Sequence, residues 1–405
     1  MSKPSFHVMA KPAGAACNLH CYYCFYYDKQ ALYPHKRQHM DGQVLEQFVK
    51  DYYASHSGPL VSFAWQGGEP TLAGLEFFRE AVELQRQHCP PGWQFENALQ
   101  TNGMLIDEEW AAFLAAEDFL IGLSWDGPGS LHDAYRGEGT GAKVQAAWRL
   151  LQQHGVKVNT LSVVHRENAR QPRNVYSFLR GEGVEHLQFI PLVRYADDGS
   201  LTADSVDPLD YGRFLIGVWR QWLERDVGSA FIQTFEGTLS QMAGLPAGLC
   251  VFSKTCGSNI IVEHNGDVYP CDHFVEAPLR LGNITEQSLE ALVQSPEQLA
   301  FGRAKHTDLH ADCRSCPVLH LCWGGCPKDR VAGKSSLCAG YSLFFRYTEP
   351  YHQQLLEGLR RGGAAPVVAK SIAQDVAKVW NGVQRNASCP CGSGFKYKRC
   401  CGSLQ

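Results

Sequence analysis

The stretch CNLHCYYC, residues 17–24, holds three cysteines at the spacing C-x3-C-x2-C, with aromatic residues between and behind them. Three thiolates are one ligand short of a complete tetrahedral zinc site. They are the right number to hold three irons of a cubane iron–sulfur cluster, which leaves the fourth iron open to a small chelating ligand. The spacing therefore predicts a cluster that binds a further molecule, with Cys17, Cys21 and Cys24 as its ligands.

Two other kinds of metal site have partly similar cysteine patterns. A zinc site would need a fourth nearby ligand, for which His20 is the candidate, and a ferredoxin-type cluster would need a fourth cysteine followed by proline. An open iron suits the amino and carboxylate groups of S-adenosylmethionine, and an electron from the cluster can cleave the sulfonium of that cofactor to a carbon radical. The fold around the loop bears on the choice between these sites.

Short β-rich runs alternate with helical stretches over the first half of the chain. Strands separated by helices indicate a parallel sheet, and six such units in series predict an α/β fold with a partial (β/α)6 TIM-like barrel. The expected strands are residues 6–11, 60–65, 95–100, 119–125, 157–165 and 187–193, and the expected helices lie near 41–55, 74–88, 107–116, 141–154, 172–181 and 208–225.

Polar motifs follow the first four predicted strands. The cysteine loop comes after the first strand, and GGEP (67–70), QTNG (100–103) and SWDGP (124–128) come after the next three. Because the functional residues of such barrels lie at the carboxyl ends of the strands, we expect these motifs to converge on one face.

The composition favours a soluble cytoplasmic protein. The 405 residues carry a formal net charge of −4, which gives no reason to expect a nucleic-acid partner. The chain has no run of 18 apolar residues, and its start lacks a charged region followed by a hydrophobic stretch, so we expect neither a membrane anchor nor export. In a reducing compartment, 16 cysteines at clustered spacings indicate metal ligation rather than disulfides.

A second group of cysteines lies downstream of the predicted barrel. The stretch IIVEHNGDVYPCDHF, residues 260–274, predicts a hairpin that turns at Asn265-Gly266 and presents Cys271 just past its second strand. Eight thiolates make two complete sets of four for iron–sulfur clusters, and zinc ribbons are the alternative. The eight are Cys250, Cys256, Cys271, Cys313, Cys316, Cys322, Cys326 and Cys338.

The cysteine loop followed by GGEP resembles the radical S-adenosylmethionine superfamily, whose members have a partial six-unit (β/α) barrel. By position, the resemblance implies that Gly68 and Glu69 bind the methionine part of S-adenosylmethionine. Taken alone, GGEP is also compatible with a tight turn capped by its glutamate, and an ordinary core position is the alternative for Leu192. The residues implied to bind the cofactor are Tyr23, Gly68, Glu69, Ser124, Arg136 and Leu192.

The order and spacing of the downstream cysteines resemble the SPASM extension, which carries two auxiliary 4Fe-4S clusters. Together with the cluster of the first loop, this resemblance implies three 4Fe-4S clusters in the chain. It assigns Cys250, Cys256, Cys271 and Cys326 to one auxiliary cluster, and Cys313, Cys316, Cys322 and Cys338 to the other.

Two further stretches resemble the anaerobic sulfatase-maturating enzymes: YPCDHF (269–274) matches their YPCD motif, and KPAGAACNLHCYYCFY (11–26) matches their opening. The likeness runs from residue 1 to about 350. These radical oxidoreductases convert a cysteine or serine of a sulfatase polypeptide to Cα-formylglycine, which implies the same activity here. Asp272 corresponds to the family's proposed proton acceptor, although an aspartate after a strand can instead cap a turn or pair with a basic residue.

The chain ends in CPCGSGFKYKRCC, which resembles the SEC-C zinc motif. So small a segment needs a metal to fold, so we expect a tetrahedral Zn²⁺ site there, a disordered tail with idle cysteines being the alternative. The expected domains are a radical barrel (1–235), a SPASM domain (236–350), a helix and linker (351–385) and the SEC-C motif (386–405). The expected zinc ligands are Cys389, Cys391, Cys400 and Cys401.

Two other functions fit part of this pattern. The first is a SPASM radical enzyme that modifies another ribosomal peptide by a thioether or carbon–carbon crosslink, against which the YPCD motif counts. The second is a non-enzymatic electron-transfer protein, which would need neither GGEP nor an open iron. The expected partners are a sulfatase polypeptide, an electron donor such as flavodoxin or ferredoxin, and an export chaperone recruited through the basic segment FKYKR (395–399) of the tail.

Overall fold

The computed structural model describes residues 3–33 and 39–403, so the first two residues of the predicted barrel, residues 34–38 and the last two residues of the predicted tail lie outside the described part. The chain forms two compact units. Unit 1 comprises residues 1–125, 132–159 and 255–304, and unit 2 comprises residues 126–131, 160–254 and 305–405.

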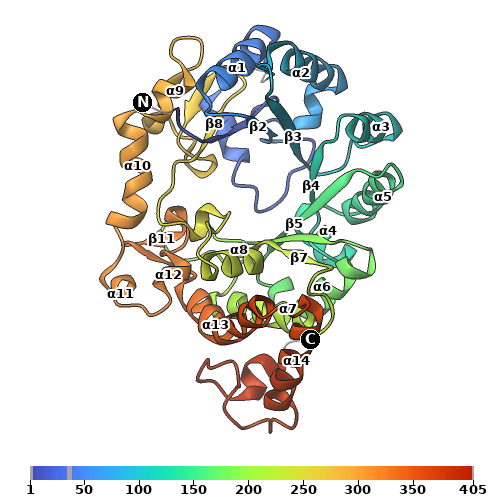
Figure 1. The fold of residues 1–405 in the computed structure, drawn as a ribbon, viewed down its shortest axis with the longest axis vertical. Coiled ribbons are helices and arrows are strands. Elements are labelled where there is room, and N and C mark those ends of the chain that lie inside the picture. Colours follow the sequence, from blue (N-terminus) through green and yellow to red (C-terminus); the bar gives the residue numbers. More distant parts are fainter. Residues whose placement is uncertain (1–2, 34–38, 404–405) are drawn as a thin grey trace. The chain divides into compact units, whose positions relative to one another are not determined.

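Unit 1 contains the first four strands, which pair in parallel in chain order (Figure 1). Val61, Phe63 and Trp65 are buried and alternate with more exposed neighbours, as expected for a strand with one face in the core. The strands are β1 (His7–Ala10), β2 (Leu60–Trp65), β3 (Gln94–Thr101) and β4 (Leu120–Ser124), and the helices of this unit are α1 (Gly42–Ser55), α2 (Leu75–His88), α3 (Glu108–Ala116), α5 (Thr140–Gln153) and α9 (Leu289–Val293).

The downstream hairpin joins the same sheet as β1. Strand β8 (Asn259–Val262) pairs in parallel with β1, so that Ala10 lies opposite Val262, and β9 (Asp267–Tyr269) returns antiparallel to β8. Gly266 has φ 86° in the connecting turn, which confirms the predicted hairpin. A short strand, β10 (Gly282–Asn283), extends the sheet beyond β9. The pairing of β8 with β1 places the residues after β9 in the same unit as the cysteine loop.

Unit 2 contains β6 (His186–Pro191), paired in parallel with β7 (Phe231–Ile232). Helix α13 (Cys338–Arg360) packs along α7 (Pro208–Arg225), and α14 (Ala365–Trp380) contacts both (Figure 1). The other elements of this unit are α6 (Pro172–Gly181), α8 (Gln233–Met242), α11 (Ala311–Arg314), α12 (Leu319–Cys322), β11 (Arg330–Val331) and β12 (Lys334–Ser335).

Three elements contain residues of both units: α4 (Gly129–Arg136), β5 (Lys157–Val164) and α10 (Pro296–Thr307). Short 3-10 turns cover Tyr27–Leu32, Pro70–Ala73, Asn168–Arg170, Cys250–Phe252, Asp272–Phe274, Ala277–Leu279, Pro327–Asp329, Tyr397–Arg399 and Cys401–Ser403.

The predicted α/β class with a parallel sheet is confirmed. Each of the six predicted strands is present as β1 to β6, and each of the six predicted helices is present within two residues of its expected limits. None of the helices in the described residues is long and apolar enough to cross a membrane.

The linker predicted within residues 351–385 is wrong for its central part, which forms α14. Ala369, Ile372, Val376 and Trp380 recur at the spacing of one helix face, and all four are buried. Pro366 stands in the first turn, where its fixed φ favours the start of a helix. The alanine and lysine content that suggested a linker is equally the composition of a good helix.

Candidate active site

The GGEP turn crosses the backbone that leads into the cysteine loop. The N–H of Gly68 donates to the carbonyl of Gly14 at 2.8 Å, and the N–H of Glu69 donates to the carbonyl of Ala16 at 2.7 Å. A Cβ added to Gly68 would lie only 2.0 Å from the carbonyl oxygen of Ala16. No side chain fits at this position, so Gly68 is what allows the end of β2 to lie directly against the loop that starts at Cys17.

The carboxylate of Glu69 is buried and joins the ends of two strands. It accepts hydrogen bonds from the N–H and the hydroxyl of Thr71 at 3.1 and 2.6 Å, from the hydroxyl of Thr101 at 2.8 Å and from the N–H of Asn102 at 2.8 Å. Burial raises the pKa of this carboxyl group, and the four hydrogen bonds oppose that rise. Glu69 therefore fixes the GGEP turn to the QTNG motif at the end of β3.

Asn102 extends this connection to the first cysteine. Its side-chain amide donates to Oδ1 of Asn18 at 2.8 Å and lies 3.8 Å from the sulfur of Cys17. Loops after β1, β2 and β3 thus meet at Cys17, as the motif positions predicted. The sequence identified the QTNG motif but not Asn102 as the contact residue, and a polar residue two positions after the predicted strand (95–100) was the available signal.

Tyr23 and Arg136, both predicted to bind the cofactor, lie together. The ring of Tyr23 stacks on that of Tyr135 at 5.9 Å, and the guanidinium carbon of Arg136 lies 5.4 Å from the centre of the Tyr23 ring. The N–H of Tyr22 donates to the carbonyl of Tyr135 at 2.8 Å, which holds the end of α4 against the cysteine loop. Ser124 ends β4 and is 8% exposed.

The three cysteines of the first loop lie close enough for their charges to interact. Burial raises the pKa of Cys17 to about 11, and nearby Glu69, Cys21 and Cys24 act in the same direction. Three neighbouring thiolates fit a cubane cluster, in which each thiolate binds a different iron.

Asp272, which is 18% exposed, forms an ion pair with the buried side chain of Lys11. Burial by itself would raise the pKa of Asp272, but the adjacent Lys11 ammonium holds it below its ordinary value. Lys11 is 1% exposed and its ammonium lies 4.7 Å from the centre of the Tyr26 ring, while the Tyr26 hydroxyl donates to Glu263. The sequence analysis gave pairing with a basic residue as one alternative for Asp272, and the structure contains such a pair. The basic residue is Lys11, which the sequence analysis did not identify.

Lys11 also connects Asp272 to the GGEP turn. It follows the last residue of β1, and a Cβ built on Gly67 would lie 3.3 Å from its side chain. Its backbone N–H donates to the carbonyl of Val262 at 2.9 Å, so the end of β1 is also held to the hairpin that leads to Asp272. Asp272 therefore lies in the same unit as the cysteine loop, and Lys11 connects its carboxylate to the GGEP turn that contacts this loop.

In unit 2, four of the predicted cluster ligands line one cavity of about 60 Å³. They come from α11, the turn after it, and the facing ends of α12 and α13. The chemistry of the set fits an iron–sulfur cluster, because four thiolates from separate segments face a common space. The four residues are Cys313, Cys316, Cys322 and Cys338.

An arginine that the sequence did not single out holds the loop between Cys322 and Cys326. The three residues between these cysteines, Trp323, Gly324 and Gly325, all have positive φ, from 47° to 72°. The guanidinium of Arg330 donates to the carbonyls of all three, at 3.0 to 3.3 Å. Arg330 therefore stabilises a backbone conformation that L side chains rarely adopt.

The other predicted cluster set is divided between the units, and it stays a prediction. Cys256 and Cys271 belong to unit 1, whereas Cys250 and Cys326 belong to unit 2. Leu192, predicted at the cofactor, also belongs to unit 2, where its N–H donates to the carbonyl of Val164 at 2.8 Å.

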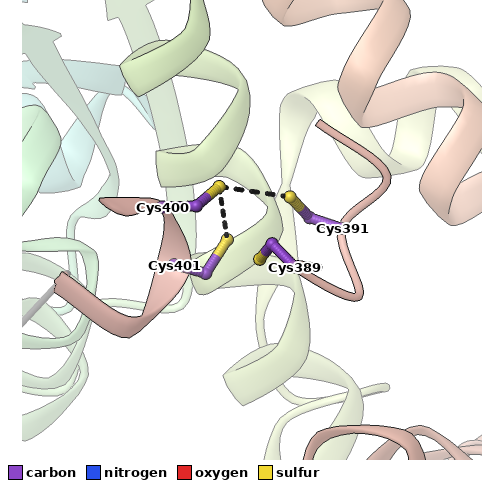
Figure 2. Close-up of side chains that lie close together, drawn as sticks. All are labelled: Cys389, Cys391, Cys400 and Cys401. Carbon is purple, nitrogen blue, oxygen red and sulfur yellow. Dashed lines mark hydrogen bonds between the residues drawn. The ribbon is translucent and has the colours of Figure 1, made fainter. Parts of the chain in front are cut away.

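The four C-terminal cysteines form a compact group (Figure 2). Their sulfur atoms all lie within 4.8 Å of one another, and the Cys400 sulfur is 3.4 Å from that of Cys391 and 3.9 Å from that of Cys401. Tetrahedral zinc with four thiolates places them about 3.8 Å apart. Cys389, Cys391, Cys400 and Cys401 therefore fit a Zn²⁺ ion by number, chemistry and spacing.

Three family models match the chain. The model described as the radical SAM superfamily matches residues 12–179, the one described as an iron–sulfur cluster-binding domain, SPASM, matches residues 250–317, and the SEC-C motif matches residues 385–403. The first match contains the GGEP and QTNG contacts described above. The third contains all four C-terminal cysteines.

Relatives named as anaerobic sulfatase-maturating enzymes match most of the chain. A serine-type anaerobic sulfatase-maturating enzyme of Bacteroides thetaiotaomicron is 36% identical over 93% of this chain and 97% of the relative. A cysteine-type enzyme of Clostridium perfringens is 37% identical over 86% of this chain and 97% of the relative. Among solved structures, native anSMEcpe with bound AdoMet and Cp18Cys peptide has a TM-score of 0.80 and 35% identity, covering 88% of this chain and all of the other.

Proposed function

Because this chain belongs to the anaerobic sulfatase-maturating enzymes of the radical S-adenosylmethionine superfamily, we propose that it oxidises a cysteine or serine of a sulfatase polypeptide to Cα-formylglycine. One structural observation carries most weight within this family assignment. The buried carboxylate of Glu69 and the amide of Asn102 join the GGEP turn to the loop of Cys17. That junction supports a single site at the carboxyl ends of β1, β2 and β3.

The family implies S-adenosylmethionine and iron–sulfur clusters as cofactors. We propose that Cys17, Cys21 and Cys24 hold the cluster that binds S-adenosylmethionine, and that the two auxiliary sets assigned above each hold a 4Fe-4S cluster, which makes three. The proposed contacts to S-adenosylmethionine are Tyr23, Gly68, Glu69, Ser124, Arg136 and Leu192.

Bound S-adenosylmethionine would supply a carbon radical that removes a hydrogen atom from Cβ of the target residue. A two-electron oxidation then leaves one proton and one electron to be removed. We propose that Asp272 accepts the proton of the target's thiol or hydroxyl group. Its carboxylate is kept ionised by Lys11, and it follows Cys271 directly in the chain. The residues around the 60 Å³ cavity would hold an auxiliary cluster that serves as electron acceptor. A serine target gives the aldehyde directly, and a cysteine target gives a thioaldehyde that water converts to the aldehyde and hydrogen sulfide.

The substrate assignment predicts a specific product. Anaerobically reconstituted protein, incubated with S-adenosylmethionine, dithionite and a peptide with cysteine or serine in a C/S-x-P-x-R context, should form the aldehyde. Mass spectrometry should show a loss of about 18 Da for a cysteine peptide and about 2 Da for a serine peptide, as the oxidation described above requires. The same peptide with alanine at the target position is the control. Cleavage of S-adenosylmethionine without aldehyde, but with a thioether or carbon–carbon crosslink, would favour the other SPASM activity.

We further propose that the enzyme acts in the cytoplasm, receives electrons from a flavodoxin or ferredoxin, and meets a sulfatase destined for export through a chaperone bound at its tail. The tail displays exposed Lys396, Lys398 and Arg399. An exposed basic face suits an acidic partner, and docking would raise the local substrate concentration without changing the chemistry.

Replacing Lys396, Lys398 and Arg399 together by glutamate is therefore expected to leave peptide oxidation unchanged and to reduce maturation of a full-length exported sulfatase in cells. The matched control replaces three exposed cations elsewhere, Lys143, Arg149 and Lys157. Equal sulfatase maturation by the two triple variants would contradict the recruitment role. Formylglycine content of the purified sulfatase is the measurement.

A further inference from the structure

Arg213 of α7 is buried and directed to the C-terminal cysteines. Its Nε–H donates to the sulfur of Cys400 at 3.1 Å, and its Nη1 pairs with Asp210 at 2.8 Å. The residue is only 9% exposed. Arginine is rarely buried unless its charge is compensated. Asp210 supplies one compensating partner, and a thiolate at Cys400 would supply a second.

Aromatic contacts attach the segment that carries the C-terminal cysteines, residues 385–403, to α7 at further points. The guanidinium of Arg213 lies 5.3 Å from the centre of the Phe395 ring. Two turns further along α7, Arg220 lies 4.0 Å from the centre of the Trp380 ring, and Trp380 in turn packs 6.2 Å from Tyr397. These cation–π contacts hold both the cysteine segment and the end of α14 against α7.

Helix α7 is also tightly packed against α13. A Cβ added to Gly212 would lie 2.5 Å from the carbonyl of Gly340, and one added to Gly340 would lie 2.0 Å from the carbonyl of Pro208. The indole N–H of Trp380 donates to the hydroxyl of Tyr347 on α13 at 2.7 Å. A change in how the cysteine segment is attached to α7 should therefore affect the packing of three helices.

We propose that Arg213 is an outer-sphere partner of a Zn²⁺ ion held by the four C-terminal cysteines, and that this metal fastens the segment to α7. Four thiolates around one Zn²⁺ carry a net charge of −2, which the guanidinium partly neutralises while it orients Cys400. Without the metal, a segment of this size has too small a core to keep its fold. The tail is thus an integral part of unit 2, and this role does not depend on which substrate the enzyme oxidises.

The test compares zinc release from the full-length protein and from three variants. We expect Arg213→Gln to release zinc to a chromogenic chelator about 10- to 100-fold faster than the unaltered protein, because loss of a partner of a metal ligand typically has an effect of that size on affinity. Arg225→Gln is the matched control, because Arg225 lies on the same helix and is exposed. Arg213→Lys, which keeps the charge but loses the planar group, should fall between them.

Equal zinc release by Arg213→Gln and Arg225→Gln would overturn the proposal. If Arg213→Gln does not fold, the unaltered protein decides the question: zinc removal by a chelator should lower the midpoint of thermal unfolding, and added Zn²⁺ should restore it. An unchanged midpoint after complete zinc loss would also overturn the proposal. Neither readout requires a sulfatase peptide, so failure here is distinguishable from failure of the proposed activity.

Discussion

Replacing Cys17, Cys21 and Cys24 together by alanine is expected to abolish reductive cleavage of S-adenosylmethionine and to remove about four irons per chain. The unaltered protein should contain about twelve irons and about one zinc when all proposed sites are filled. The loss should be confined to one cluster, because none of the eight cysteines proposed to hold the auxiliary clusters is replaced. Iron analysis and detection of 5′-deoxyadenosine after addition of dithionite measure the two effects.

The remaining free cysteine provides a matched control for this experiment. Cys89 follows the end of α2, is partly buried and belongs to none of the proposed sites, so Cys89→Ala should keep both the iron and the cleavage activity. Unchanged iron in the triple variant would refute the assignment of the first loop. Loss of all twelve irons would instead show that the clusters depend on one another.

Asp272→Asn is expected to reduce aldehyde formation by about 100-fold or more while cleavage of S-adenosylmethionine persists. The amide has nearly the size of the carboxyl group but cannot accept a proton at neutral pH. Because Lys11 holds the pKa of Asp272 below its ordinary value, the unaltered carboxyl is ionised under assay conditions and can act as the base. Separate measurement of aldehyde and of 5′-deoxyadenosine distinguishes the loss of a base from the loss of cofactor binding.

The same substitution also leaves the buried ammonium of Lys11 without its carboxylate, and an unpaired buried charge destabilises a protein by about 3–5 kcal/mol. Thermal unfolding and iron content of Asp272→Asn must therefore be measured alongside its activity. Glu276→Gln is the control, because Glu276 is exposed and lies four residues further on. Aldehyde formed at the normal rate by Asp272→Asn would transfer the base role to His273 or water, and loss of auxiliary iron would indicate that Asp272 is structural.

The local elements of the fold could be predicted because each depends on residues close together in the sequence. Alternating buried residues such as Val61, Phe63 and Trp65 identify a strand, and helix limits follow from capping residues such as Asp41 and Asp107. Cysteine spacing and the motifs after each strand similarly indicated the site, because the carboxyl ends of parallel strands share one edge. The error at α14 arose because the same alanine-rich composition suits a linker and a helix, and only burial against α7 separates the two.

What the sequence by itself determined was the order of strands and helices, the cysteine groups and the family they indicate. The tertiary structure alone decided the partners of the charged groups, because such pairs join segments far apart in the chain and leave no periodic signal. Lys11 and Asp272 are 261 residues apart and meet because β8 pairs with β1. Arg213 and Cys400 are 187 residues apart and meet because the last segment packs on α7. In both cases burial makes an unpaired charge costly, so the packing of the chain selects the partner.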